Sequence, residues 1–173
     1  FVTVDNVEEL AGLPEANIAA AAKMAEKNGQ PGKYMFNMQR PSCNPVLQYC
    51  HNRELREKVY NAYYNRGNVG NEYDNKEISR KIVTLRLKNY AEMALKDRMA
   101  KTPEAVYNLL DQIWEPAVKK AKEELDDIRA EIKKEGKNFE PAGWDYMYYL
   151  DKAKKAKFNI DDALVSEYLE INN

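Results

Sequence analysis

Hydrophobic residues recur at helical spacing through most of the chain, and the clearest run follows Asn52. Leu55 is followed four, seven and eight positions later by Val59, Ala62 and Tyr63. This spacing places the four residues on one face of a helix. The intervening polar positions are predicted to face outward: Arg53, Glu54, Lys58 and Asn61. We therefore predict a helix that is capped by Asn52, ended by Gly67 and buried along its apolar stripe.

Shorter helices are predicted before this one. Asn44 followed by Pro45 has the form of a cap with proline at the first helical position, so a helix is expected from there through Tyr49. Asp5 and Glu8 come close to a capping box ahead of a short helix that Gly12 closes. Residues 15–28 favour a further helix, ended by Gly29, whose small face carries Ile18, Ala21, Ala22 and Ala25.

The period changes to two between Lys33 and Arg40, with Tyr34, Phe36 and Met38 on one face and Met35, Asn37 and Gln39 on the other. This pattern predicts a strand or an extended arm. A single strand leaves its backbone groups unpaired, so it needs a partner. Either residues 2–4 or a segment outside this chain meets that need, and the pattern does not choose between them.

The second half of the chain is also predicted to be helical. Asp74 or Asn75 caps a helix with Ile78, Ile82 and Leu85 on one face. Thr102 and Pro103 begin the longest helix, which runs almost to Gly136 and spans roughly 45–50 Å. Its apolar positions are Val106, Leu109, Leu110, Ile113, Trp114, Ala117, Ala121, Leu125, Ile128 and Ile132. Pro116 predicts either a kink or two helices placed end to end.

Two more helices are predicted towards the C-terminus. Residues 139–143 form a loop, Asp145 caps the helix after it, and Asp161 caps a last helix with Leu164 and Tyr168. The fold class is therefore all-α, mainly helical and bundle-like, with six to eight helices and one short β-hairpin or arm. Residues 1–173 are expected to form one helical domain or part of one.

Composition narrows the function classes. The chain has 173 residues, of which 44% are hydrophobic and 32% charged, and its 27 basic and 28 acidic side chains leave a net charge of −1. With so small a net charge, the chain has no overall electrostatic field that would attract nucleic acid. No apolar run approaches the roughly 20 residues that span a bilayer. We expect a cytoplasmic protein, with the periplasm as the alternative. Residue 1 is Phe rather than Met, so we expect a piece cut from a longer protein.

Residues for catalysis are not found in the sequence. Zinc-dependent proteolysis uses His-Glu-x-x-His and a further carboxylate, whereas this chain has one histidine, His51. We expect His51 to lie at the surface or at a helix cap. Cys43 and Cys50 are expected to be reduced and structural, because seven residues apart across a loop-to-helix junction they need not face each other. A metal site of these two with His51 is disfavoured, since the spacing matches no standard zinc site and a fourth ligand is missing. We predict no catalytic, metal-binding or cofactor-binding residue.

Three side-chain groups have two interpretations each. Trp144, Tyr146, Tyr148 and Tyr149 line a peptide channel or, as we favour, pack in the core. A basic run could meet an anion, but acidic neighbours favour a solvated helix face: Lys152, Lys154, Lys155 and Lys157. Glu123 and Asp127 are also expected on a solvated face rather than in acid catalysis.

Several short motifs together resemble one family. The central matching residues are Pro45, Tyr49, Cys50, Asn52, Arg53, Leu55, Arg56, Glu57, Tyr60, Arg66, Asp74 and Asn75. Others are Gly12 to Glu15, Asn89 to Ala91, Met99, Ala100, Pro103, Trp144, Asp145, Tyr148, Tyr149, Asp161, Asp162, Leu164 and Tyr168. In this order they are similar to the zinc metallopeptidase family of thimet oligopeptidase, oligopeptidase A and peptidyl-dipeptidase. The peptidyl-dipeptidase branch fits best.

The resemblance departs from the family pattern at one place. Family members have a longer helix end and a turn before the Asn-Tyr-Ala run, whereas here Lys88 is followed directly by Asn89. Either residues are deleted or a loop is omitted from the sequence. The omission is favoured because one helix can hardly turn into the next within a residue or two.

The resemblance implies a fragment that lies before the zinc-binding helix of a two-lobed helical peptidase. In such enzymes two histidines and a glutamate hold zinc, and a deep channel admits short peptides. This chain would then be scaffold and channel wall, inactive alone, with peptides and the remaining domains as its partners. The competing hypothesis is a free-standing helical module that binds another protein through its apolar stripes.

Overall fold

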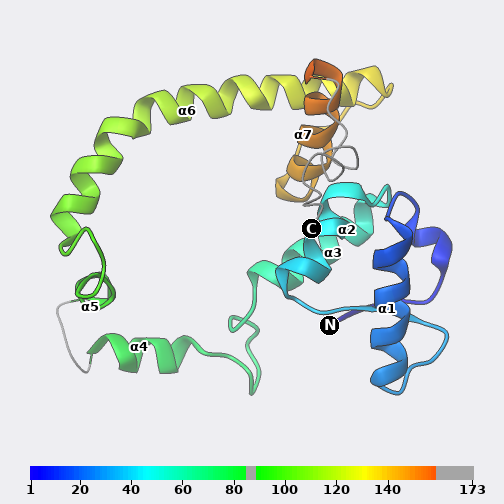
Figure 1. Cartoon of the computed structure of the whole chain (residues 1–173), viewed down its shortest axis with the longest axis horizontal. Helices are drawn as coiled ribbons and strands as arrows, with labels where there is room; N and C mark the ends of the chain where they lie inside the picture. The colour runs from blue at the N-terminus through cyan, green and yellow to red at the C-terminus, as the bar shows by residue number, and fades with distance from the viewer. Residues whose placement is uncertain (85–88, 159–173) are drawn as a thin grey trace, which may run out of the picture. The chain divides into compact units, whose positions relative to one another are not determined.

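The computed structural model describes residues 1–84 and 89–158 and is mainly helical, as predicted (Figure 1). Its elements are β1 (Val2–Val4), a 3-10 helix η1 (Val7–Leu10), α1 (Glu15–Lys27), β2 (Tyr34–Phe36), α2 (Arg40–Tyr49), α3 (Arg53–Tyr64), α4 (Lys76–Thr84), α5 (Tyr90–Leu95), α6 (Pro103–Lys134) and α7 (Gly143–Phe158). The expectations for Leu85, for the junction at Lys88 and for the helix after Asp161 lie outside the described residues.

The chain divides into two compact units. One comprises residues 1–64 together with the chain from residue 124 onward, and the other comprises residues 65–123.

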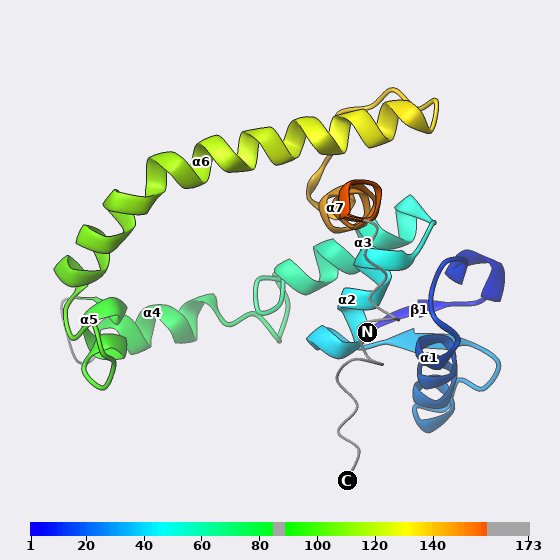
Figure 2. The ribbon, with the colours of Figure 1, turned by 45° about the horizontal axis from the view of Figure 1, so that its top comes forward.

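The two strands settle the question that the period-two pattern left open. β1 and β2 pair antiparallel, with Val2 opposite Phe36 and Val4 opposite Tyr34 (Figure 2). The N-terminal residues are therefore the partner of the strand. Met35 and Phe36 are both buried even though they point to opposite faces, because α1 packs against β2 while Phe36 joins the main core.

The main core lies where the hairpin, α1, α2 and α3 meet. It is built from Val4, Leu10, Leu13, Ala21, Phe36, Cys43, Val46, Leu47, Cys50, Leu55 and Val59. The Asn52 cap is confirmed, since the Leu55 N–H donates to Asn52 Oδ1 at 3.2 Å. A second, smaller cluster joins α6 to α7 through Ile128, Ile132, Tyr148 and Tyr149.

Two predicted helix starts are wrong. α2 begins at Arg40, where the N–H groups of Ser42 and Cys43 both donate to Gln39 O at 3.0 Å, so Pro45 lies inside the helix. The first-turn preference for proline fits Pro41 as well as Pro45, and the earlier proline is the one used.

The predicted cap at Asp145 is also wrong. α7 begins at Gly143, and Asp145 lies inside the first turn. Its carboxylate reaches back and accepts the Ala142 N–H at 3.1 Å, which is the inner half of a capping box.

Caps in residues 65–123 follow the predictions more closely. Asp74 Oδ1 accepts the Lys76 N–H at 2.9 Å, and Thr102 Oγ1 accepts the Ala105 N–H at 3.3 Å. Helix α6 runs unbroken through Pro116, so the expectation of two separate helices is wrong.

Candidate functional site

A buried ion-pair site joins α3 to α7. Arg53 and Arg56, one turn apart on α3, both bind the carboxylate of Asp145. Arg53 Nη2 lies 2.9 Å from Asp145 Oδ2, and Arg56 Nη2 lies 3.1 Å from Asp145 Oδ1. Asp145 is fully buried and Arg56 is 2% exposed, so this pair has little contact with water. We call these three residues the arginine–aspartate clasp.

Arg56 also satisfies backbone carbonyls around the clasp. Its guanidinium donates to Cys50 O at 2.8 Å, His51 O at 3.2 Å and Trp144 O at 3.2 Å, and lies 4.2 Å from the centre of the Tyr148 ring. A buried charge is tolerated when its donors are matched in this way. One side chain thereby holds the end of α2, the start of α3 and the start of α7.

Arg53 forms the outer side of the clasp. Its guanidinium lies 4.7 Å from the Phe139 ring centre and 5.4 Å from that of Trp144. The hydrogen bond to Asp145 raises the pKa of Arg53. The prediction that Arg53 faces outward holds only in part, because 41% of its side chain is exposed while its guanidinium binds Asp145 and lies against two aromatic rings.

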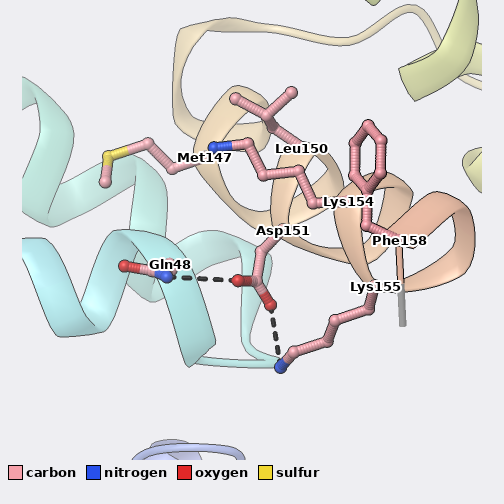
Figure 3. Close-up of a pocket in the computed structure, with 7 residues that line it drawn as sticks. All are labelled: Gln48, Met147, Leu150, Asp151, Lys154, Lys155 and Phe158. Carbon is pink, nitrogen blue, oxygen red and sulfur yellow. Dashed lines mark hydrogen bonds and ion pairs between the residues drawn. The ribbon is translucent and has the colours of Figure 1, made fainter. Parts of the chain in front are cut away.

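A groove lies between α2 and α7 (Figure 3). It has a volume of about 480 Å³ and is lined by Gln48, Met147, Leu150, Asp151, Lys154, Lys155 and Phe158. Asp151 accepts from Gln48 Nε2 at 3.2 Å and pairs with Lys155 at 3.0 Å. The groove thus combines apolar side chains, those of Met147, Leu150 and Phe158, with a carboxylate that already has two partners.

A second groove, of about 360 Å³, is rich in tyrosine and lies within the same unit. It is lined by Leu47, Tyr60, Tyr64, Leu125, Pro141, Ala142, Gly143, Tyr146 and Met147, and we call it the tyrosine groove. Gly143 admits Tyr60 here, since a Cβ on Gly143 would lie 2.4 Å from the Tyr60 hydroxyl. Beside it, the Tyr146 hydroxyl donates to Glu124 at 3.1 Å.

The four C-terminal aromatics therefore divide between the two interpretations. Tyr148 and Tyr149 are buried in the core, as favoured, whereas Tyr146 is 39% exposed and lines the tyrosine groove. Trp144 is half-buried, and its indole N–H is buried without a hydrogen-bond partner.

Three lysines of the basic run on α7 form ion pairs, so the run is more than a solvated helix face. Lys152 pairs with Glu135, Lys155 with Asp151, and Lys157 with Asp127. Glu135 also accepts from Lys137 at 2.7 Å and from the Tyr149 hydroxyl at 3.1 Å. Burial raises the pKa of Glu135, but these hydrogen bonds outweigh it and lower the pKa from 4.5 to about 2.

The remaining candidate residues are His51, Cys43 and Cys50. The His51 side chain is exposed, and its ring lies edge-on to Tyr148, while the backbone N–H of His51 donates to Ala11 O at 2.8 Å. Cys43 and Cys50 are buried and not disulfide-bonded, and burial raises the pKa of the Cys50 thiol. These three residues form no metal site: across residues 1–84 and 89–158, no three His, Cys, Asp or Glu side chains are grouped to hold an ion.

No helix in the described ranges combines the length and apolar character needed to cross a membrane. What these side chains offer chemically is packing, ion pairing and two open grooves.

Comparison with known proteins identifies the family. The model of peptidase family M3 matches residues 46–173. The chain belongs to this family. It is 35% identical to oligopeptidase A of Haemophilus influenzae, over 98% of this chain, and 31% identical to dipeptidyl carboxypeptidase of Escherichia coli, over 99% of it. Oligopeptidase A of Escherichia coli is 34% identical over 98%.

The alignments take in nearly all of this chain but only part of each relative. This M3 chain covers 26% of the length of each of these three relatives. These matches confirm the family resemblance seen in the short motifs. They do not favour the peptidyl-dipeptidase branch, since the two oligopeptidases A are 35% and 34% identical and the dipeptidyl carboxypeptidase is 31% identical.

Proposed function

We propose that this chain is a scaffold and channel-wall segment of a zinc-dependent, peptidyl-dipeptidase-like metallopeptidase that cleaves short peptides. One observation carries the proposal: the alignments take in 98–99% of this chain but only 26% of the relatives. On this proposal, the remaining three quarters of such a protein contain the reaction centre.

The residues present do not fit a zinc site. Peptidase zinc needs three protein ligands, commonly two histidines and a carboxylate, and leaves one position open for water. The sequence has a single histidine, His51, and its ring lies against Tyr148. We therefore assign no step of hydrolysis to this chain, and expect it to be inactive alone.

What the chain contributes instead is a rigid surface. The clasp fixes α7 against α3, and this packing shapes the tyrosine groove beside it. Tyrosine rings accept apolar side chains while their hydroxyls bond to polar groups, which suits a wall that peptides pass along. The tyrosine groove is the part of the wall that we assign to peptide contact.

A transplant tests the proposal. The matching quarter of Escherichia coli oligopeptidase A is replaced by this chain, and hydrolysis of an internally quenched peptide is measured with and without a zinc chelator. We expect the hybrid to be active and chelator-sensitive, and this chain alone to be inactive. Zinc-dependent cleavage by the chain alone, or a folded hybrid without activity, would contradict the proposal.

The second candidate is a free-standing helical interaction module, favoured by the exposed apolar side chains of α6. Sequencing the gene beyond codon 173 separates the two. A downstream His-Glu-x-x-His segment supports the peptidase, and a stop codon supports the module. The cytoplasmic location stays a prediction.

A further inference from the structure

Asn28 and Gly29 follow the end of helix α1 and form the one Asn-Gly pair in the sequence. Every other asparagine that has a successor is followed by a residue with a side chain. Glycine lacks a Cβ, so the backbone nitrogen after an asparagine is least hindered when glycine comes next. Both residues are exposed, and among the described residues nothing beyond the chain neighbours lies within 4 Å of where a Cβ on Gly29 would be. No neighbouring group shields this pair from solvent.

Hydrogen bonds hold the two groups apart in the folded chain. Asn28 Nδ2 donates to Met24 O at 2.8 Å, and the Gly29 N–H donates to Glu26 O at 3.0 Å. The ψ angle of Asn28 is 20°, and the Gly29 nitrogen reaches the Asn28 side-chain carbon only after rotation about this bond. Both hydrogen bonds must therefore break, and the end of α1 must open locally, before the two groups can meet.

We propose that Asn28 is a site of spontaneous deamidation, that the reaction proceeds only when the end of α1 opens, and that conversion weakens the connection between α1 and β2. The reactants are the chain itself with water and hydroxide from the solvent. This inference does not depend on the proposed function.

The reaction is a ring closure followed by hydrolysis. Hydroxide removes the proton from the Gly29 nitrogen, which then forms a bond to Cγ of Asn28 while the Cγ–Nδ2 bond breaks. Nδ2 leaves as ammonia after taking a proton from water, which restores the hydroxide, and a succinimide ring remains. Water opens this ring: attack at Cγ gives aspartate, and attack at the backbone carbonyl carbon gives isoaspartate. No atom is oxidised or reduced.

Both products lose contacts that fix the end of α1. A carboxylate at position 28 cannot donate to Met24 O, and its negative charge lies beside the carbonyl end of the helix, where an anion is unfavourable. Isoaspartate also lengthens the backbone by one carbon, which displaces the Gln30 N–H from Ala25 O, its partner at 2.9 Å. Ala25 is fully buried, and α1 packs on β2, so the change falls next to this packing.

Peptide mass spectrometry tests the site and its protection. The chain is incubated in mildly alkaline buffer, either folded or unfolded in urea, and aspartate and isoaspartate at position 28 are quantified over time. We expect conversion to be at least about tenfold slower in the folded chain, because only the locally open form reacts. Equal rates in the folded and unfolded chain would overturn the protection by α1.

Asn68 is the internal control within the same samples, since it is exposed but is followed by Val69. We expect Asn28 to convert before Asn68 in both the folded and the unfolded chain. Conversion of Asn68 first would overturn the assignment of the site. Asn28→Gln retains an amide but would need a larger ring, so residue 28 should stay unconverted; conversion of this variant at the parent rate would refute the ring closure.

Asn28→Asp tests the consequence without waiting for the reaction. We expect its thermal unfolding midpoint, followed by circular dichroism, to fall by a few degrees, because the bond to Met24 O is lost and a carboxylate faces the helix end. Asn68→Asp is the matched control: it introduces the same charge at an exposed position, and its midpoint should equal that of the parent. Equal midpoints for the two variants would overturn the claim that conversion weakens the fold.

Discussion

Arg56 and Asp145 show how two charged side chains are accommodated in a core. Each is almost completely buried, and the carboxylate receives hydrogen bonds from two guanidinium groups and from the Ala142 backbone. Removing one member of such a group leaves the others charged, buried and unmatched. The clasp is therefore where a single substitution should have its largest effect on unit stability.

We expect Asp145→Ala to lower the free energy of unfolding by about 3–5 kcal/mol, because two arginines lose their counter-ion. Urea unfolding is followed by Trp144 fluorescence in a Trp114→Phe background, which leaves one reporter in this unit. Asp126→Ala is the control: Asp126 is 74% exposed and pairs with Arg129, so its loss should be less than about 1 kcal/mol. Similar losses for both variants would contradict the assigned role of the clasp.

The lowered pKa of Glu135 predicts that the stability of the folded protein depends on pH. Its pKa is about 2 in the folded protein and 4.5 as the ordinary value, so the ionised carboxylate stabilises the fold. This stabilisation is fully present above pH 4.5 and is lost as the pH falls through about 2. The unfolding midpoint of the parent should therefore drop across this window, and Glu135→Gln should remove part of that drop. An identical pH profile for Glu135→Gln would refute this.

Alanine substitutions at Gly12 and Gly29 would distinguish the cost of backbone strain from the cost of steric crowding. Both have positive φ, 92° and 74°, but a Cβ on Gly12 would lie 2.3 Å from Tyr49 O whereas Gly29 faces open space. We expect Gly29→Ala to cost about 1–2 kcal/mol and Gly12→Ala distinctly more, because the Tyr49 backbone must move. Chemical unfolding of both variants measures the difference. Equal costs would show that the crowding is relieved elsewhere.

Some residue roles could be predicted from the sequence and others could not. The caps at Asn52 and Thr102 act within three residues, so their partners stand in the same short window. Arg53 and Asp145 are separated by 92 positions, and nothing local to either residue marks the other as its partner. The pairing depends on how α3 and α7 pack, which local patterns do not contain.

At the scale of elements, α6 is notable for a proline inside a continuous helix. Pro116 lacks the N–H that would bond four residues back and crowds the preceding turn. Helix α6 thus has a weak point within its 32 residues.

We expect Pro116→Ala to stabilise α6 locally by up to about 3 kcal/mol, seen as slower amide hydrogen exchange at residues 113–120. Ala121→Gly, at another exposed position of the same helix, should act in the opposite direction by about 1 kcal/mol. Unchanged exchange in Pro116→Ala would mean that the proline does not limit this helix.

The element predictions failed where one rule had two matching residues. Pro41 and Pro45 both satisfy the preference for an early proline, and the helix begins at the first. The strand at Tyr34–Phe36 was recognisable by its period, but its partner was not, because pairing joins segments about 30 residues apart.

At the scale of the whole molecule, the two units differ in how much they bury. Residues 1–64 with 124–158 contain both apolar clusters, while residues 65–81 and 89–123 contain no buried side chain.

We expect the isolated chain to show this contrast in hydrogen exchange. Amides of α2 and α3 around Val46 and Val59 should be strongly protected, and those of α4 and α5 should exchange almost as fast as in an unfolded chain. Mass spectrometry of peptides from a timed exchange series measures both at once. Comparable protection in the two units would contradict the assignment of a core to the first alone.

The clasp also has a consequence for biosynthesis. Arg56 waits for a carboxylate that lies 89 residues further along, and the ribosome adds roughly 5–20 residues per second. Translation of the residues between them therefore takes about 4–18 seconds, during which the hydrated guanidinium of Arg56 cannot yet pair with Asp145 and α3 cannot yet pack against α7. Chaperones and proteases that meet the emerging polypeptide encounter it during that interval, so slow codons between these positions should lower the yield of intact protein.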